Sequence, residues 1–168
     1  MEPHRHQMTG TTATSLVVAD WTIDAAAVVA ACGVRLARAS TLRLVVPAWL
    51  HGLDWVGDPR GSIPCAQRQL ERILQLCEAD DLHVSSAAVG DPDPISAICD
   101  AADDVDRILL FARGRHVSAG YPLSVASRAA RLTGLPLESF SIALNPRTER
   151  RRHFTAGHCE PAPTAQLA

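Results

Sequence analysis

The sequence predicts an α/β fold: a single domain whose five-stranded parallel sheet carries helices on both faces, in a three-layer α/β/α arrangement. Two observations lead to this prediction. Short apolar runs alternate with segments of helical period in the order β-α-β-α-β-α-β-α-β, and such alternation builds a parallel sheet through right-handed crossovers. The 168-residue chain is also 47% apolar and 20% charged, a globular composition that can bury a core of ordinary size.

Five short runs have the composition of β-strands; they cover residues 15–20, 41–49, 82–89, 106–111 and 137–144. The first and fourth runs are largely apolar, as strands buried on both faces are. Pro47 cannot donate to a ladder, so the second strand should end near it. Glu138, Ser139 and Ser141 make the fifth run more polar, which is typical of an edge strand.

Four segments between these runs have helical spacing; they cover residues 22–40, 65–81, 93–104 and 125–134. The second segment is the clearest, because its apolar residues recur at i, i+3, i+4 and i+7 over 70–77. Asp24, Asp93 and Ser124 are the predicted N-caps of three helices. Gly134 is expected to end the last helix.

All of these elements fall within residues 14–144, which we interpret as the domain. Residues 1–13 are predicted to form a disordered N-terminal arm, and residues 145–168 a disordered basic tail that contains prolines. No apolar run reaches the roughly 18 residues that a membrane-spanning helix needs. The N-terminus does not have the layout of a secretory signal, so we expect a cytoplasmic protein without a membrane partner.

The charge distribution narrows the classes of partner. The 16 cationic side chains are all Arg, so mechanisms that need a lysine are excluded. Residues 14–144 contain 15 acidic side chains and 11 Arg, a net charge of −4. An acidic domain argues against general nucleic-acid binding.

Four stretches together resemble the universal stress protein family, a branch of the adenine-nucleotide α-hydrolase-like folds. They are "LVVADWT" (16–22), "VGDPDPISAICDAADDVDRILLF" (89–111), "SVASRAARLTGLP" (124–136) and "LESFSI" (137–142). The resemblance implies the strand order 3-2-1-4-5 with four helices, and a nucleotide bound past the carboxyl ends of the strands. It also implies a homodimer formed through the C-terminal strand.

The resemblance implies that ATP or AMP would be held by five residues: Asp20, Val46, Gly114, Ser124 and Val125. Of these, Asp20 would recognise the adenine and Ser124 would donate its hydroxyl to the phosphates at a helix N-terminus.

The expected phosphate signature is altered in this chain. Phe111 and Leu123 stand at two of its three glycine positions, and the spacer between Gly114 and residue 123 is eight residues rather than nine. A bulky residue, Trp21, also follows Asp20, and with Phe111 it is expected to obstruct the site.

Other residues predicted at the same edge of the sheet are compatible both with a nucleotide site and with its loss. Arg113, Arg115 and His116 add positive charge to the altered loop, and Trp49 and Trp55 add aromatic side chains to its rim. These aromatic side chains would either stack on a purine or fill the place of one. We found no supported catalytic or metal-binding constellation.

The sequence therefore favours a non-catalytic regulatory or scaffolding protein that is dimeric, has a degenerate nucleotide site and acts through a protein partner. One alternative is an ATP- or AMP-binding stress sensor. A second alternative is a slow nucleotide hydrolase.

Overall fold

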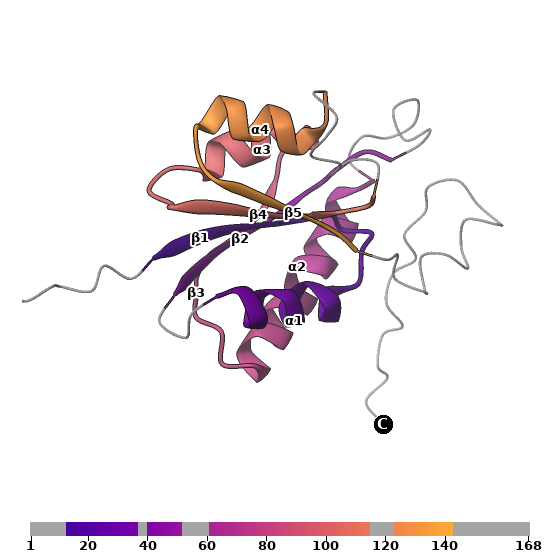
Figure 1. Cartoon of the computed structure of the whole chain (residues 1–168). Helices are drawn as coiled ribbons and strands as arrows, with labels where there is room; N and C mark the ends of the chain where they lie inside the picture. The colour runs from indigo at the N-terminus through magenta and orange to yellow at the C-terminus, as the bar shows by residue number, and fades with distance from the viewer. Residues whose placement is uncertain (1–12, 37–39, 52–60, 115–122, 143–168) are drawn as a thin grey trace, which may run out of the picture.

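The computed structural model describes residues 13–36, 40–51, 61–114 and 123–142, and it confirms the predicted α/β fold (Figure 1). Strands and helices alternate along the chain as expected. In order they are β1 (Thr14–Ala19), α1 (Ala25–Arg35), β2 (Thr41–Pro47), α2 (Ile63–Ala79), β3 (Val84–Gly90), α3 (Pro94–Ala101), β4 (Arg107–Ala112), α4 (Val125–Thr133) and β5 (Leu137–Ser141).

The five strands form one parallel sheet in the order β3-β2-β1-β4-β5. Helices α1 and α2 cover one face of this sheet, and α3 and α4 cover the other (Figure 1). At the centre, Val17 of β1 pairs with Leu44 of β2 and with Leu109 of β4. After β1, the chain adds β2 and β3 on one side of this strand and then adds β4 and β5 on its other side. The switch point in strand order therefore lies between β1 and β4.

Each face of the sheet has its own hydrophobic core. Val17, Leu109 and Phe111 belong to the core beneath α1 and α2, whereas Leu16 and Leu110 belong to the core beneath α3 and α4. This alternation follows from the two-residue period of a strand. It explains why β1 and β4 read as nearly continuous apolar runs in the sequence.

The helix ends are capped largely as predicted. Asp93 accepts from Ile95 N, and Ser124 accepts from Ser127 N. Gly134 ends α4 in the left-handed region, with φ of 68°. Asp24 takes the N-cap position of α1 without a side-chain cap bond.

The second helix begins earlier than the sequence predicted. It starts at Ile63 rather than at residue 65, because Pro64 fits the first turn of a helix, where its missing N–H is not needed. Ser62 stands at the N-cap position, but its hydroxyl donates to Ala48 O at 2.6 Å instead of capping the helix. This bond ties the start of α2 to the end of β2.

The turn after β3 is held by its own polar groups and by close packing. Asp91 Oδ1 accepts from Asp93 N at 2.7 Å, so the side chain of Asp91 stabilises the turn that leads into the helix capped by Asp93. A Cβ at Gly90 would lie 2.7 Å from Ala97 Cβ and 2.9 Å from Val45 Cγ1. The glycine is therefore required for α3 to pack this closely on the sheet.

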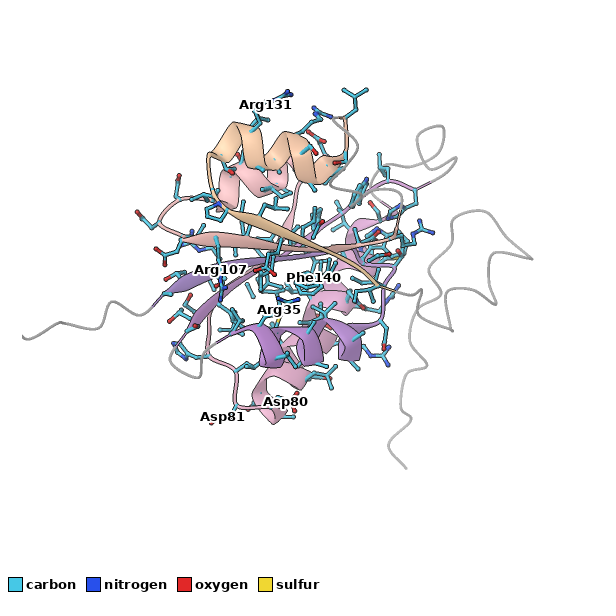
Figure 2. All side chains as sticks on the ribbon, in the orientation of Figure 1. Arg35, Asp80, Asp81, Arg107, Arg131 and Phe140 are labelled. Atoms are coloured by element: carbon cyan, nitrogen blue, oxygen red, sulfur yellow. The ribbon has the colours of Figure 1, made fainter. Side chains whose placement is uncertain are left out.

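Strand β5 forms an edge of the sheet, as its polar composition predicted. The ring of its Phe140 stacks on Phe111 with a centroid separation of 4.7 Å. The Arg35 guanidinium lies 5.5 Å from the Phe140 centroid (Figure 2). Arg35 Nη1 also lies 3.4 Å from Glu138 Oε2. These contacts attach the outer strand to the end of α1.

The predicted N-terminal arm (1–13) and C-terminal tail (145–168) lie outside the described residues, except for Ala13, so both remain predictions. Among the helices that the structure describes, none combines the length and the hydrophobicity of a transmembrane segment.

Candidate functional site

The buried carboxylate of Asp20 is the centre of the site. Asp20 directly follows β1, and its N–H donates to Phe111 O of β4 at 2.9 Å, so it is held at the switch point between these strands. The residue is only 1% exposed. Its Oδ1 accepts from Thr22 N at 2.9 Å and from Thr22 Oγ1 at 2.8 Å.

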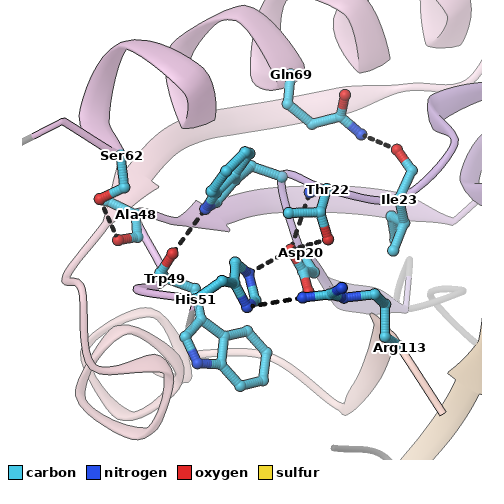
Figure 3. A network of polar contacts seen from close by, with 10 residues as sticks. Asp20, Thr22, Ile23, Ala48, Trp49, His51, Ser62, Gln69 and Arg113 are labelled. Carbon is cyan, nitrogen blue, oxygen red and sulfur yellow. Dashed lines mark hydrogen bonds and ion pairs between the residues drawn. The ribbon is translucent and has the colours of Figure 1, made fainter. Parts of the chain in front are cut away.

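A histidine and an arginine extend this carboxylate into a chain of hydrogen bonds (Figure 3). His51 Nε2 lies 3.0 Å from Asp20 Oδ1, and Arg113 Nη2 lies 3.1 Å from His51 Nδ1. A guanidinium can only donate, so Nδ1 must accept and the imidazole proton must sit on Nε2. The direction is therefore Arg113 to His51 to Asp20, with a neutral imidazole between a cation and an anion.

Two tryptophans enclose the His51 ring. Its centroid lies 5.4 Å from that of Trp21 and 5.5 Å from that of Trp49. The Trp21 indole N–H donates to Trp49 O at 2.7 Å, which fixes one aromatic residue to the backbone of the other. As a result, the His51 side chain is only 7% exposed although it lies beyond the end of β2.

Opposing effects set the pKa of Asp20. Burial of the carboxyl acts to raise its pKa, and it is the largest single effect. Hydrogen bonds from His51 and from the Thr22 backbone and hydroxyl act in the opposite direction, and the pKa of Asp20 lies below its ordinary value of 3.8. The carboxylate is therefore ionised at neutral pH. Its Oδ2 is buried and has no hydrogen-bond partner among the described residues.

Two further hydrogen bonds connect the beginning of α2 to the segments that carry the site residues. Gln69 of α2 donates through Nε2 to Ile23 O at 3.0 Å, and Ser62 donates to Ala48 O (Figure 3). Both carbonyls lie in connections that leave the central strands. The start of α2 is thus bonded to the segments that carry Thr22 and Trp49.

The other predicted contact residues occupy separate positions. Val46 is buried in the core beneath α1 and α2, and Gly114 is exposed just after β4. Ser124 caps α4 and also donates to Ser127 Oγ at 3.1 Å, while Val125 packs half-buried against the opposite core. In the described part of the chain, no hydrogen bond joins Ser124 to Asp20.

The two residues expected to obstruct the site differ in their surroundings. The Phe111 side chain is 0% exposed and packs in the core beneath α1 and α2, stacked on Phe140. Trp21, in contrast, packs beside His51 within the site. Trp55, Arg115 and His116 lie outside the described residues.

Sequence reasoning did not identify His51 as part of the site, and it treated Arg113 only as added positive charge. A signal was present, because each follows the carboxyl end of a strand adjacent to β1. Among the described residues, no group of three or more potential ligands could hold a metal ion.

The strand order and helix placement define a doubly wound α/β protein with the fold of the universal stress proteins. The structure is similar to that of a universal stress protein in complex with cAMP: the TM-score is 0.55 at 19% identity, over 79% of this chain and 98% of that one.

It is also similar to a universal stress protein family protein from Arabidopsis thaliana with AMP bound. Here the TM-score is 0.55 at 13% identity, over 78% of this chain and 92% of that one. The sequence matches no protein-family model and no curated protein. The similarities to the two solved structures establish the fold.

Proposed function

We propose that this chain is a non-catalytic regulatory or scaffolding protein of the universal stress protein kind, whose nucleotide site is degenerate. The observation that supports this most directly is the state of Asp20. Its Oδ1 already accepts three hydrogen bonds from the chain itself, two from Thr22 and one from His51. By resemblance, Asp20 is the residue that would recognise an adenine, and here its Oδ1 is already bonded to His51.

The phosphate side of the site supports the same proposal. Leu123 is 71% exposed at a position where the resemblance places a glycine, and its side chain stands directly before the cap of α4. The Ser124 hydroxyl, which would donate to a phosphate, accepts from Ser127 N and donates to Ser127 Oγ. A phosphate would have to displace these contacts and approach past the leucine.

The test is to ask whether the purified protein carries or binds nucleotide. We expect no adenine absorbance and no nucleotide mass after denaturation, and no heat on titration with ATP or AMP at micromolar concentrations. Micromolar binding that Asp20→Ala abolishes would refute the proposal and establish the sensor function instead.

Two observations keep the nucleotide sensor as the second candidate. The two similar structures described above contain cAMP and AMP. In addition, α4 follows β4 in the chain, so its N-terminus, capped by Ser124, lies at the carboxyl side of the sheet. If nucleotide is bound, phosphate release on incubation with ATP would separate a slow hydrolase from a sensor.

We further propose that the protein is a homodimer in which two β5 strands pair across a two-fold axis. Ile142 N donates to Ala112 O of β4 at 3.1 Å. Consecutive N–H groups point to opposite sides of a strand, so the N–H of Ser141 faces away from β4. An outer edge of this kind offers a row of backbone groups to a second copy or to a protein partner.

Ser141→Pro should therefore weaken dimerisation at least about tenfold without removing a bond to β4. The measurement is mass by light scattering during gel filtration across the micromolar range. Ser141→Ala is the matched control, and it should remain dimeric. A wild-type protein that elutes as a monomer at every concentration would refute the dimer.

A further inference from the structure

We propose that His51 is an internal ligand of a binding site for small nitrogen heterocycles, formed by Asp20, Arg113, Trp21 and Trp49. The inference deepens the proposed function and rests on it, since a site occupied by the chain's own imidazole is closed to outside ligands. An external ring of the same chemistry would bind when His51 leaves.

The contacts of the imidazole are those of a bound heterocycle rather than of a packed core residue. One ring nitrogen donates to the buried Asp20 carboxylate at 3.0 Å, and the other accepts from Arg113 at 3.1 Å. Indole rings lie 5.4 Å and 5.5 Å from its centroid. Charged groups on two edges and aromatic rings around the ring together recognise a planar molecule with one donor and one acceptor nitrogen.

The Asp20 carboxylate and the Trp21 indole are held in place by contacts that do not involve His51. Asp20 is fixed by its N–H bond to Phe111 O and by the two bonds from Thr22. Arg113 directly follows β4, and Trp21 is bonded to the Trp49 backbone. Loss of the imidazole would therefore leave its acceptor, Asp20, and one of its two indole neighbours, Trp21, in position for an external ring.

The second carboxylate oxygen of Asp20, Oδ2, indicates a further feature of the ligand. Asp20 Oδ2 is buried and lacks a hydrogen-bond partner within the described part of the chain, so the carboxylate can accept more than His51 donates. The ligand class is thus a neutral heterocycle with a ring N–H, and a second donor such as an amino group would add to its affinity.

The test is to replace the internal ligand by an external one. His51→Ala should bind imidazole at about pH 8, where imidazole is mostly neutral. The change in fluorescence of Trp21 and Trp49 reports binding, and the melting temperature should rise by about 5 °C at ten times the dissociation constant. Wild-type protein should not respond, because its tethered imidazole is present at a high effective concentration.

Two controls separate specific binding from general stabilisation. 1-Methylimidazole has nearly the same shape but no N–H, so it should bind His51→Ala at least about tenfold more weakly. The double variant Asp20→Asn/His51→Ala should also lose about tenfold in affinity for imidazole, because the acceptor is no longer charged. Equal responses to the two ligands, or no response of folded His51→Ala, would refute the proposal.

If His51→Ala does not fold, its refolding yield from urea gives the same information. Imidazole should raise that yield and 1-methylimidazole should not; an unchanged yield refutes the internal ligand. Imidazole rescue of His51→Ala and the test of the proposed function are independent experiments, because the proposed function is tested by titrating the wild-type protein with ATP and AMP. Nucleotide binding there would refute the degenerate site, whereas failed rescue refutes only the role of His51.

Discussion

Phe111→Ala should lower the free energy of unfolding by about 3–5 kcal/mol, because it leaves a large cavity in a fully buried part of the sheet. Phe111 is 0% exposed, and its ring lies nearly parallel to that of Phe140, at an interplanar angle of 15°. The substitution removes this stack together with contacts to the core beneath α1 and α2. Urea unfolding followed by circular dichroism measures the change.

Leu132→Ala is the matched control for this experiment. Leu132 is 61% exposed on α4, where alanine is a good helix former, so its substitution should change stability by no more than about 0.5 kcal/mol. A loss below about 1 kcal/mol for Phe111→Ala would show that the ring is not part of a close-packed core.

The same variant also tests whether Phe111 obstructs the site. Its side chain packs with the α1 and α2 core, whereas the ring that contacts Asp20 at the site is that of His51. We therefore expect Phe111→Ala to lose stability without gaining affinity for ATP or AMP. Phe111, at a position where the resemblance places a glycine, stacks on Phe140 of β5, and in the proposed function it is His51 that closes the site.

Much of the fold was predictable because local patterns determine it. The alternation of apolar runs and helical segments is sufficient to predict the parallel sheet, and Asp93, Ser124 and Gly134 have the residue types of helix caps and stops. The position of Asp20 was predictable because an acid directly after a buried strand lies at the edge of the sheet where ligands bind in such folds.

The remaining features depend on contacts between distant segments. The partnership of His51 with Asp20 and Arg113 spans 31 and 62 residues, and no spacing rule relates them. The side of the sheet that Phe111 faces depends on the strand register, which a shift of one residue would reverse. The sequence therefore indicated Asp20 and an altered loop, whereas the contact of His51 with Asp20 became apparent only from the folded chain.

Asp20→Asn should reduce the free energy of unfolding by about 2–3 kcal/mol at neutral pH, because it removes the anion at the end of the hydrogen-bond chain from Arg113 through His51. The side chain keeps its shape, so the change reports charge. The pKa of Asp20 in the folded protein lies below its ordinary value of 3.8. As the pH falls, the carboxyl of Asp20 is therefore protonated in the unfolded chain before it is protonated in the folded protein. The stability that the carboxylate gives to the folded protein is lost on acidification.

The difference in stability between wild type and Asp20→Asn should thus be constant from neutral pH down to about pH 5 and should shrink below about pH 4. Urea unfolding of both proteins at a series of pH values measures it. Asp104→Asn is the control: Asp104 is exposed in a left-handed turn with φ of 56°, which asparagine tolerates, so this variant should follow wild type throughout. A difference that persists undiminished well below pH 4, or that grows on acidification, would mean that His51 and Thr22 do not hold an ionised carboxylate at the switch point.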